Sequence, residues 1–315
     1  MKSRTSFIGY VIGIGVVALL PVVIRSEYDI HIFVMVWIFS LLVIGFNFIF
    51  GYIGQLSLGH GAFFAIGAYA SALATLKWGV SFWIGLPFAA LVAGVFGFVI
   101  GMITLRWRSH FFVIATICFN MIIYILILNW VSLTNGPVGI GSIPAPSLGG
   151  MAFSTKVHFY YLVFLFVLGA LWFTKKVVSS PVGRAFAAIR ENEPLAESVG
   201  ISAYSFATLA FVISTAMAGM AGSFYAHYVT YISPEIDEFS VMISILVMVV
   251  LGGKGTVLGP VIGAVIFTFL PEYLRFAKDL RLPIFGLILI LGIVFLPRGI
   301  ITLPRLIRSR WSDKR

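Results

Sequence analysis

Charged residues are scarce in this chain: Asp, Glu, Lys and Arg make up 10% of its 315 residues, against about 25% in ordinary soluble domains. Hydrophobic residues make up 60% of the chain, and its mean hydropathy is +1.07. A soluble domain of this size could not bury so much apolar surface. The composition therefore excludes a soluble enzyme, a disordered chain and a nucleic-acid module. It predicts an all-α, polytopic integral membrane protein.

Groups that carry redox, metal or ion-coupled chemistry are also few. Cys118 is the single cysteine, and no spacing of Cys and His typical of a metal site occurs. The cores of the apolar runs contain no Asp, Glu, Lys or Arg, the residues on which ion-coupled carriers depend. The runs also lack the inward-facing His pairs that ligate haem. We therefore expect no metal, no cofactor of the chain's own and no ion-driven pump.

A membrane-spanning helix needs about 20 mostly apolar residues. The sequence holds ten candidates, some of them short or broken by glycine: 7–24, 30–50, 56–76, 82–105, 111–131, 157–174, 204–227, 240–251, 257–273 and 283–296. With the N-terminus in the cytoplasm, this plan puts 15 of the 21 Lys and Arg residues inside. Because cytoplasmic loops are enriched in positive charge, we expect ten spans with both termini cytoplasmic.

Glycine is concentrated where two of these runs are interrupted. The first interruption holds Gly51, Gly54, Gly59 and Gly61, which weaken a helix and let backbones approach closely. One interpretation is a short cytoplasmic turn before a tightly packed helix. The other is a kinked element beside a translocation path, since non-helical backbone in a membrane must be buried in protein or face a cavity. The polar residues predicted to line such a path are Asn47, Gln55, Ser57, His60 and Asn120.

The second interruption, at Gly252, Gly253, Lys254 and Gly255, is not a phosphate-binding loop. A Walker A motif requires Gly where Met248 stands and Ser or Thr directly after the lysine. Because run 240–251 is too short to cross a bilayer, we expect the loop to lie within the membrane thickness. The tripeptide at 57–59, Ser-Leu-Gly, has a faint echo in Val-Leu-Gly at 257–259. Internal repeats of this kind point to a central path in transporters.

The longest predicted cytoplasmic loop, residues 175–202, contains capping residues for two short helices. Ser180 precedes a proline and begins the first, Asn192 or Glu193 precedes another proline and begins the second, and Gly200 ends it. Such mixed polar and apolar helices lie on a lipid surface or fill the groove of a partner protein. The residues predicted to carry docking are Arg184, Ala187, Arg190, Glu191, Glu193, Glu197 and Gly200.

Four segments carry a resemblance to a known family. They are 54–69 (GQLSLGHGAFFAIGAY), 134–139 (TNGPVG), 180–193 (SPVGRAFAAIRENE) and 252–256 (GGKGT). On these segments the chain resembles the branched-chain amino acid ABC transporter permeases of the LivM type, over about residues 30–300.

The resemblance implies a ten-span subunit of a bacterial inner-membrane importer for leucine, isoleucine or valine. It implies a LivH-type permease as partner, LivG- and LivF-type ATPases that bind the ATP at the cytoplasmic face, and an extracytoplasmic solute-binding protein. It assigns residues 184–200 to ATPase coupling, although Ala196, Glu197 and Gly200 match the EAA-G pattern of importers only in part.

Other interpretations stay open on the sequence alone. Relatives of this family import urea, short amides or other amino acids, and no residue excludes them. A passive channel would need no ATPase. An integral-membrane enzyme would need a cluster of Asp, Glu, His or Cys that the spans lack, and an ion-coupled carrier would need charged residues in them. The basic run 305–315 is expected to contact anionic lipid.

Overall fold

The computed structural model describes residues 17–24, 26–106, 110–148, 151–153 and 155–273, with short pieces at 15, 286–287, 290 and 299–302. Most of the predicted spans 7–24 and 283–296, both chain ends and the basic run 305–315 lie outside the described residues. The described part is mainly helical, apart from a hairpin of two-residue strands, β1 (Ser147–Leu148) and β2 (Met151–Ala152).

The helices follow in chain order, and some are short or non-α. They are α2 (Glu27–Asn47), the π-helical η1 (Phe48–Ile53), α3 (His60–Trp78), α4 (Phe82–Thr104), α5 (His110–Asn129), α6 (Val131–Thr134), η2 (Gly136–Val138), α7 (Lys156–Val178), α8 (Pro181–Glu191), α9 (Glu193–Ser198), α10 (Ala203–Val229), η3 (Pro234–Asp237), α11 (Phe239–Gly252), α12 (Gly259–Tyr273) and η5 (Ile300–Thr302).

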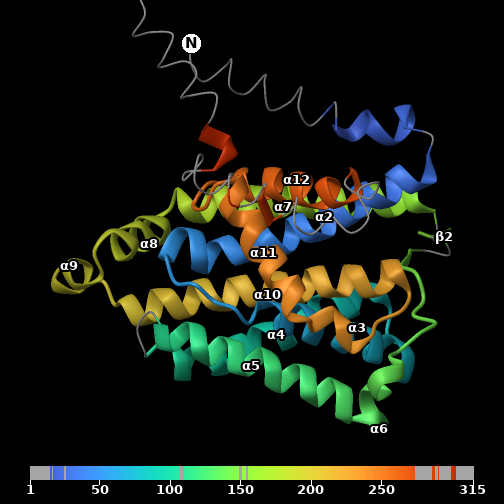
Figure 1. Ribbon diagram of the computed structural model, residues 1–315, viewed down its shortest axis with the longest axis horizontal. Coiled ribbons are helices and arrows are strands. Elements are labelled where there is room, and N and C mark those ends of the chain that lie inside the picture. Colours follow the sequence, from blue (N-terminus) through green and yellow to red (C-terminus); the bar gives the residue numbers. More distant parts are fainter. Residues whose placement is uncertain are drawn as a thin grey trace, which may run out of the picture.

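Five described helices are long and apolar enough to cross a membrane: Glu27–Ile53, Phe82–Thr104, His110–Asn129, Lys156–Val178 and Ala203–Val229. They lie along the long axis of the molecule, with α8 and α9 at one end and the hairpin at the other (Figure 1). We call these ends the α8 end and the hairpin end. The prediction of an all-α, polytopic membrane protein is confirmed.

The central position of α2 follows from its burial. The most apolar 18-residue stretch of Glu27–Ile53 is 83% buried, whereas those of α4 and α5 are each 33% buried. Helix α2 is therefore surrounded by other helices, and α4 and α5 each leave an apolar side exposed. In Figure 1, α2 lies between α7 and α12 on one side and α10 on the other. Helix α10 packs closely on α3 and α4 because Gly219 has no side chain. A Cβ there would lie 2.6 Å from the Ala89 carbonyl oxygen.

The chain re-enters the bundle between α2 and α3. Helix α2 starts at the hairpin end, where Lys156 at the start of α7 bonds Glu27 at 3.2 Å. After η1 the chain is irregular through residues 54–59, with Gly54 left-handed, and α3 begins at His60. Ser214, 2.6 Å from the His60 ring, is the twelfth of the 27 residues of α10. At 1.5 Å per residue, Ser214 lies about 16 Å along α10 from the first residue of that helix. Helix α3 therefore begins about 16 Å inside the bundle, measured along α10.

A second re-entry, from the opposite end, lies between α10 and α11. Helix α10 ends at Val229, and the chain returns through residues 230–238 to begin α11 at Phe239. Asp237, on this return, bonds Asn120, the eleventh of the 20 residues of α5. Helices α2–α3 and α10–α11 thus share one plan in opposite directions, each with a long helix, a return and a helix that begins inside the bundle. Inverted repeats of this kind are a recurrent transporter design.

One sequence prediction is corrected by this arrangement. Run 56–76 is not helical from its start, since residues 54–59 form no helix and α3 begins at His60. The structure also adds that Asp237, which lies between two apolar runs, is buried against the middle of α5. The loop at Gly252–Gly255 lies at the α8 end, where Gly255 contacts Arg190 of α8, and the return before α11 lies inside the bundle.

Candidate functional site

A group of buried polar residues lies where the two re-entrant segments meet, and we call Ser57, His60, Asn120, Ser214 and Asp237 the polar centre. The His60 ring is fully buried, with Nδ1 3.2 Å from the Ser57 hydroxyl and Nε2 2.6 Å from the Ser214 hydroxyl. Both ring nitrogens therefore have a partner, one on the re-entrant segment and one on α10. His60 thereby ties the first re-entrant segment to α10, the helix that precedes the second re-entrant segment.

Helix α5 holds both re-entrant segments through two polar side chains. Asn120 accepts the Ala62 N–H at 3.0 Å and donates to the Asp237 carbonyl at 3.1 Å. One turn earlier, the Thr116 hydroxyl accepts the Leu58 N–H at 3.0 Å. Non-helical backbone inside a membrane needs such partners, because no water is there to supply them. The sequence predicted Asn120 as polar lining, and the structure adds Thr116 and Ser214, which no sequence signal had singled out.

The carboxyl group of Asp237 has no partner within the described residues. Its side chain is 1% exposed, and neither oxygen accepts a hydrogen bond. It lies against the first turn of α3: a Cβ on Gly61 would be 2.8 Å from Oδ1 of Asp237. Asp237 lies between the predicted runs 204–227 and 240–251 and is not among the predicted path residues. The available signal was the shortness of run 240–251, which implies that the residues before it lie inside the bundle.

At the α8 end, hydrogen bonds join both glycine-rich breaks to α8. We call Asn47, Gly51, Arg190, Gly255 and Thr256 the latch. Asn47 donates to the Thr256 carbonyl at 2.9 Å and accepts the Gly255 N–H at 2.9 Å. Arg190 donates to the Gly51 carbonyl at 2.7 Å. A Cβ on Gly51 would lie 2.5 Å from the Gly255 nitrogen, so the two breaks touch directly.

The structure therefore places Asn47 apart from the other predicted path residues. Its amide is 1% exposed and occupied by the Gly255 loop, so it links helices. Gln55 lies partly exposed in a cavity of about 250 Å³ between η1, α9 and α10, near Glu193 and Glu197. Of the predicted path residues, Ser57, His60 and Asn120 lie in the polar centre. Gly59 belongs with them, since a Cβ there would lie 2.8 Å from the Thr116 carbonyl oxygen.

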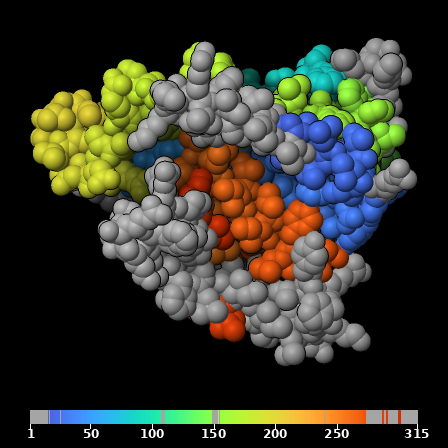
Figure 2. Space-filling model, turned by 90° about the horizontal axis from the view of Figure 1, so that it is seen from above, coloured from blue at the N-terminus to red at the C-terminus, as the bar shows by residue number. Residues whose placement is uncertain are grey.

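Helices α8 and α9 protrude at one end of the molecule (Figures 1 and 2). Their ends follow the predicted caps. Ser180 accepts the Val182 N–H, Asn192 accepts the Leu195 N–H, and Gly200 is left-handed with φ +87°. The predicted docking residues on the exposed surface of the two helices are Arg184, Ala187, Arg190, Glu191, Glu197 and Gly200, with Glu193 half-buried. Lys254 is exposed nearby, 5.5 Å from the centre of the Phe50 ring.

The apolar underside of α8 anchors it to the bundle. Phe186 is fully buried and Ile189 is 6% exposed, and the Phe186 ring lies 6.3 Å from that of Phe206 on α10. The helix thus combines a packed face with a charged free one. A displacement of α8 would move α10 and, through Arg190, the end of η1.

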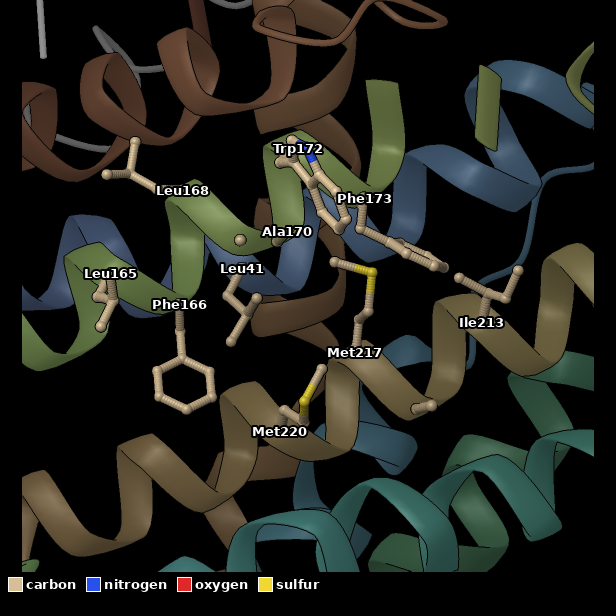
Figure 3. Close-up of a pocket in the computed structure, with 12 residues that line it drawn as sticks. Leu41, Leu165, Phe166, Leu168, Ala170, Trp172, Phe173, Ile213, Met217 and Met220 are labelled. Atoms are coloured by element: carbon tan, nitrogen blue, oxygen red, sulfur yellow. The ribbon is translucent and has the colours of Figure 1, made fainter. Parts of the chain in front are cut away.

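Two further cavities differ in chemistry. The first, about 760 Å³, is a groove in which side chains of α7 and α10 face each other over α2 (Figure 3). All twelve residues that line it are apolar or glycine: Leu41, Leu165, Phe166, Leu168, Gly169, Ala170, Trp172, Phe173, Ile213, Ala216, Met217 and Met220. Because such walls offer no partner to a charged group, the groove suits hydrocarbon and not a polar solute.

The second cavity, about 390 Å³, lies beside η3 and is lined by residues of α2, α3, α10 and α11. We call it the outer cavity. Phe39 and Phe64 form an aromatic wall, and Glu235 and Glu238 bring two carboxylates without any Lys or Arg. This composition favours a small solute with an apolar body and a positive group. Within the described residues, no group of three or more His, Cys, Asp or Glu is placed to hold a metal ion.

Removing the Ser214 hydroxyl should destabilise the polar centre. In Ser214→Ala, Nε2 of the buried His60 loses its partner at 2.6 Å, at a cost of about 1–3 kcal/mol in the free energy of unfolding. Unfolding of the purified chain in mixed micelles, followed by circular dichroism, measures the loss. Ser205→Ala is the matched control on the same helix, because its hydroxyl is exposed, and we expect it to change stability by less than about 0.5 kcal/mol. Equal stabilities of the two variants would contradict the assignment.

Comparison with known proteins places this geometry in a transport family. The profile described as "Branched-chain amino acid transport system / permease component" matches residues 30–295. The LivM permease protein of the high-affinity branched-chain amino acid transport system of Salmonella typhimurium is 34% identical over 89% of this chain and 71% of its own length. The LivH permease protein of the corresponding system of Escherichia coli is 29% identical over 84% of this chain and 92% of its own.

The similarity extends to an archaeal relative. The probable branched-chain amino acid transport permease LivM of Methanocaldococcus jannaschii is 23% identical over 69% of this chain and 68% of its own length. No solved structure matches significantly. The matched region 30–295 contains the polar centre, the latch and both short helices α8 and α9.

Proposed function

This chain belongs to the family of permease components of branched-chain amino acid transport systems, and on that premise we propose that it is the transmembrane subunit of an ATP-driven importer. Its substrate is leucine, isoleucine or valine, and its place is the bacterial cytoplasmic membrane, with α8 and α9 on the cytoplasmic side. A second permease of the LivH type completes the channel. The ATP is bound by LivG- and LivF-type ATPases, and an extracytoplasmic solute-binding protein delivers the substrate.

The observation that carries this proposal is the latch. A transport subunit without a nucleotide site of its own must receive mechanical work from partners. Helix α8 offers an exposed charged surface, and Arg190 on the same helix bonds the Gly51 carbonyl. Because Asn47 links that break to Gly255 and Thr256, a push on α8 reaches both breaks at once.

Alternating access follows from this connection. The first re-entrant segment and α3 follow η1, while α12 follows the Gly255 loop. A shift of the latch therefore moves the elements on either side of the polar centre together. ATP-driven closure of the ATPases favours one arrangement and release favours the other, so differential binding free energy replaces an ion gradient. The outer cavity then receives the solute from the hairpin end.

The first experiment is isolation of the tagged chain from its own membrane in a gentle detergent, followed by reconstitution into liposomes. We expect two ATPases and a related permease to co-purify, and leucine uptake to require ATP and the loaded binding protein. A lone chain that conducts solute without ATP would overturn the proposal in favour of a passive channel. ATP-dependent uptake of urea or short amides, without leucine uptake, would retain the importer and replace the substrate.

The docking surface has its own test. Ala187 is exposed on α8 among the predicted docking residues, so Ala187→Glu should place an unpaired charge in the ATPase contact and reduce ATPase co-purification about tenfold or more. Glu235→Arg, at the outer cavity and far along the chain from α8, is the matched control and should retain the ATPases. Normal ATPase recovery with Ala187→Glu would place the docking contact elsewhere.

A further inference from the structure

One buried group has no role in the latch or in packing. Asp237 is the only Asp, Glu, Lys or Arg among the described residues whose side chain is fully buried, and both of its carboxylate oxygens lack a hydrogen bond. The Asn120 amide donates its hydrogen bond to the backbone carbonyl of Asp237 at 3.1 Å. A carboxylate taken out of water is costly unless a cation or several donors compensate it. The fold therefore holds the Asp237 carboxylate, a hydrogen-bond acceptor without a donor, inside the bundle.

The position of this carboxylate is fixed by both re-entrant segments. It lies on η3, on the return before α11, and against Gly61 in the first turn of α3. The N-terminal end of α3 carries partial positive charge, and Gly61 lets the carboxylate approach because any side chain there would collide with it. Asn120 holds α3 and η3 together. Helix ends that begin inside a membrane protein are where transporters bind their substrates.

The surroundings match one part of an amino acid. Ile236 and Glu238, the neighbours of Asp237 on both sides, line the outer cavity, so a solute in that cavity is separated from the carboxylate by one turn of η3. The aromatic and aliphatic walls of the cavity, with Phe39, Phe64 and Val241, suit a branched side chain. No described Lys or Arg lines this cavity. A solute must supply the missing cation.

We propose that Asp237 is the subsite for the α-ammonium group of the transported amino acid, reached from the outer cavity when η3 moves. The inference rests on the proposed function and refines it. In the arrangement described here, α3 and Asn120 cover the carboxylate of Asp237. When the path opens, three ammonium N–H donors satisfy the two oxygens that now lack partners, and the charges compensate each other. The start of α11, two residues further on, presents N–H groups to the substrate carboxylate.

The test uses the complex isolated from its native membrane and reconstituted with its ATPases and binding protein. Asp237→Asn keeps the shape of the side chain and removes its charge. We expect leucine uptake to fall about tenfold or more, while assembly and basal ATPase activity remain. Asp29→Asn, the same change in the first turn of α2 at the hairpin end, where the residue does not line the outer cavity, is the matched control and should retain uptake. Uptake at the wild-type rate by Asp237→Asn overturns the inference.

A second measurement uses the wild-type complex, so that it holds even where the variant does not assemble. A hydrophobic carbodiimide modifies carboxyl groups in membrane interiors, and mass spectrometry of the peptide containing Asp237 gives the rate. We expect leucine and 3-methylbutylamine, which share the ammonium group, to slow this labelling, and 4-methylpentanoate, which lacks it, to have no effect. Labelling at an unchanged rate with the amine, or no labelling in the cycling complex, overturns the inference and favours a purely structural contact with α3.

The two proposals fail in different ways. If the wild-type complex does not import leucine, the proposed function is wrong whatever Asp237 does. If the wild-type complex imports leucine and Asp237→Asn does so equally well, only the ammonium subsite is wrong.

Discussion

Replacing Arg190 with Ala is expected to lower ATP-dependent leucine uptake by about 5- to 150-fold, the range of a coupling free energy of about 1–3 kcal/mol. The guanidinium donates to the Gly51 carbonyl at 2.7 Å, and this bond joins α8 to the first break. A charge-assisted hydrogen bond of this kind contributes about 1.5–3 kcal/mol. Without it, α8 keeps only its packing contacts with η1 and transmits its motion to η1 less effectively. The measurement is leucine uptake per ATP hydrolysed in proteoliposomes.

Uncoupling is distinguished from misfolding by the assembly and ATP hydrolysis that the variant complex retains. The Arg190→Ala complex should still assemble and hydrolyse ATP, because Phe186 and Ile189 keep α8 packed on the bundle. Lys254→Ala removes a positive charge at the same end, where it lies over the Phe50 ring, and should leave coupling unchanged. Arg190→Lys should restore part of the uptake, since one ammonium donor can reach the carbonyl without the planar fork of arginine. Wild-type uptake per ATP in Arg190→Ala would show that the bond from Arg190 to Gly51 does not transmit the motion of α8 to η1.

The second large effect is expected from a single methyl group in the latch. In Gly51→Ala the new Cβ would overlap the Asn47 amide and lie 2.5 Å from the Gly255 nitrogen. The amide must leave its place and lose its bonds to Gly255 and Thr256. Overpacking of this kind costs about 1–3 kcal/mol, and each buried polar group left without a partner adds about 1–3 kcal/mol. We expect the unfolding transition in mixed micelles to show this loss, together with loss of uptake.

Gly169→Ala is the matched control for this change. Gly169 also lies in a helix, α7, and no atom stands within 4 Å of a Cβ added there. Its replacement should leave stability unchanged or raise it by up to about 1 kcal/mol, because Ala favours a helix over Gly. If Gly51→Ala is as stable and active as Gly169→Ala, the two breaks do not pack against each other as described.

Local signals in the sequence predicted the local features of this protein well. Ser180 caps the first short helix as predicted, Asn192, one of the two predicted candidates, caps the second, and Gly200 takes the left-handed conformation that follows it. Caps act within one turn of chain, so neighbouring residues suffice to identify them. The four segments that resemble LivM-type permeases led to the family that the comparisons show.

The polar residues were predicted less well, because their roles depend on partners far away in the chain. Asn47 was expected on the path with Asn120, yet its partners, Gly255 and Thr256, lie 208 and 209 residues further on and make it part of the latch. Asp237 stands between apolar runs, a pattern typical of an exposed loop. Its backbone bond to Asn120, 117 residues earlier, and its contact with Gly61 show that η3 lies inside the bundle.

The sequence by itself determined that this chain is a helical membrane protein, where its short surface helices begin and end, and to which family it belongs. These properties follow from composition, from caps one turn long and from contiguous motifs. Tertiary structure alone decided that two returns of the chain meet at a buried carboxylate and that Arg190 holds the Gly51 carbonyl, 139 residues away. The physical reason is that a polar group inside a membrane must find its partner within the protein, and that partner is set by how the helices pack.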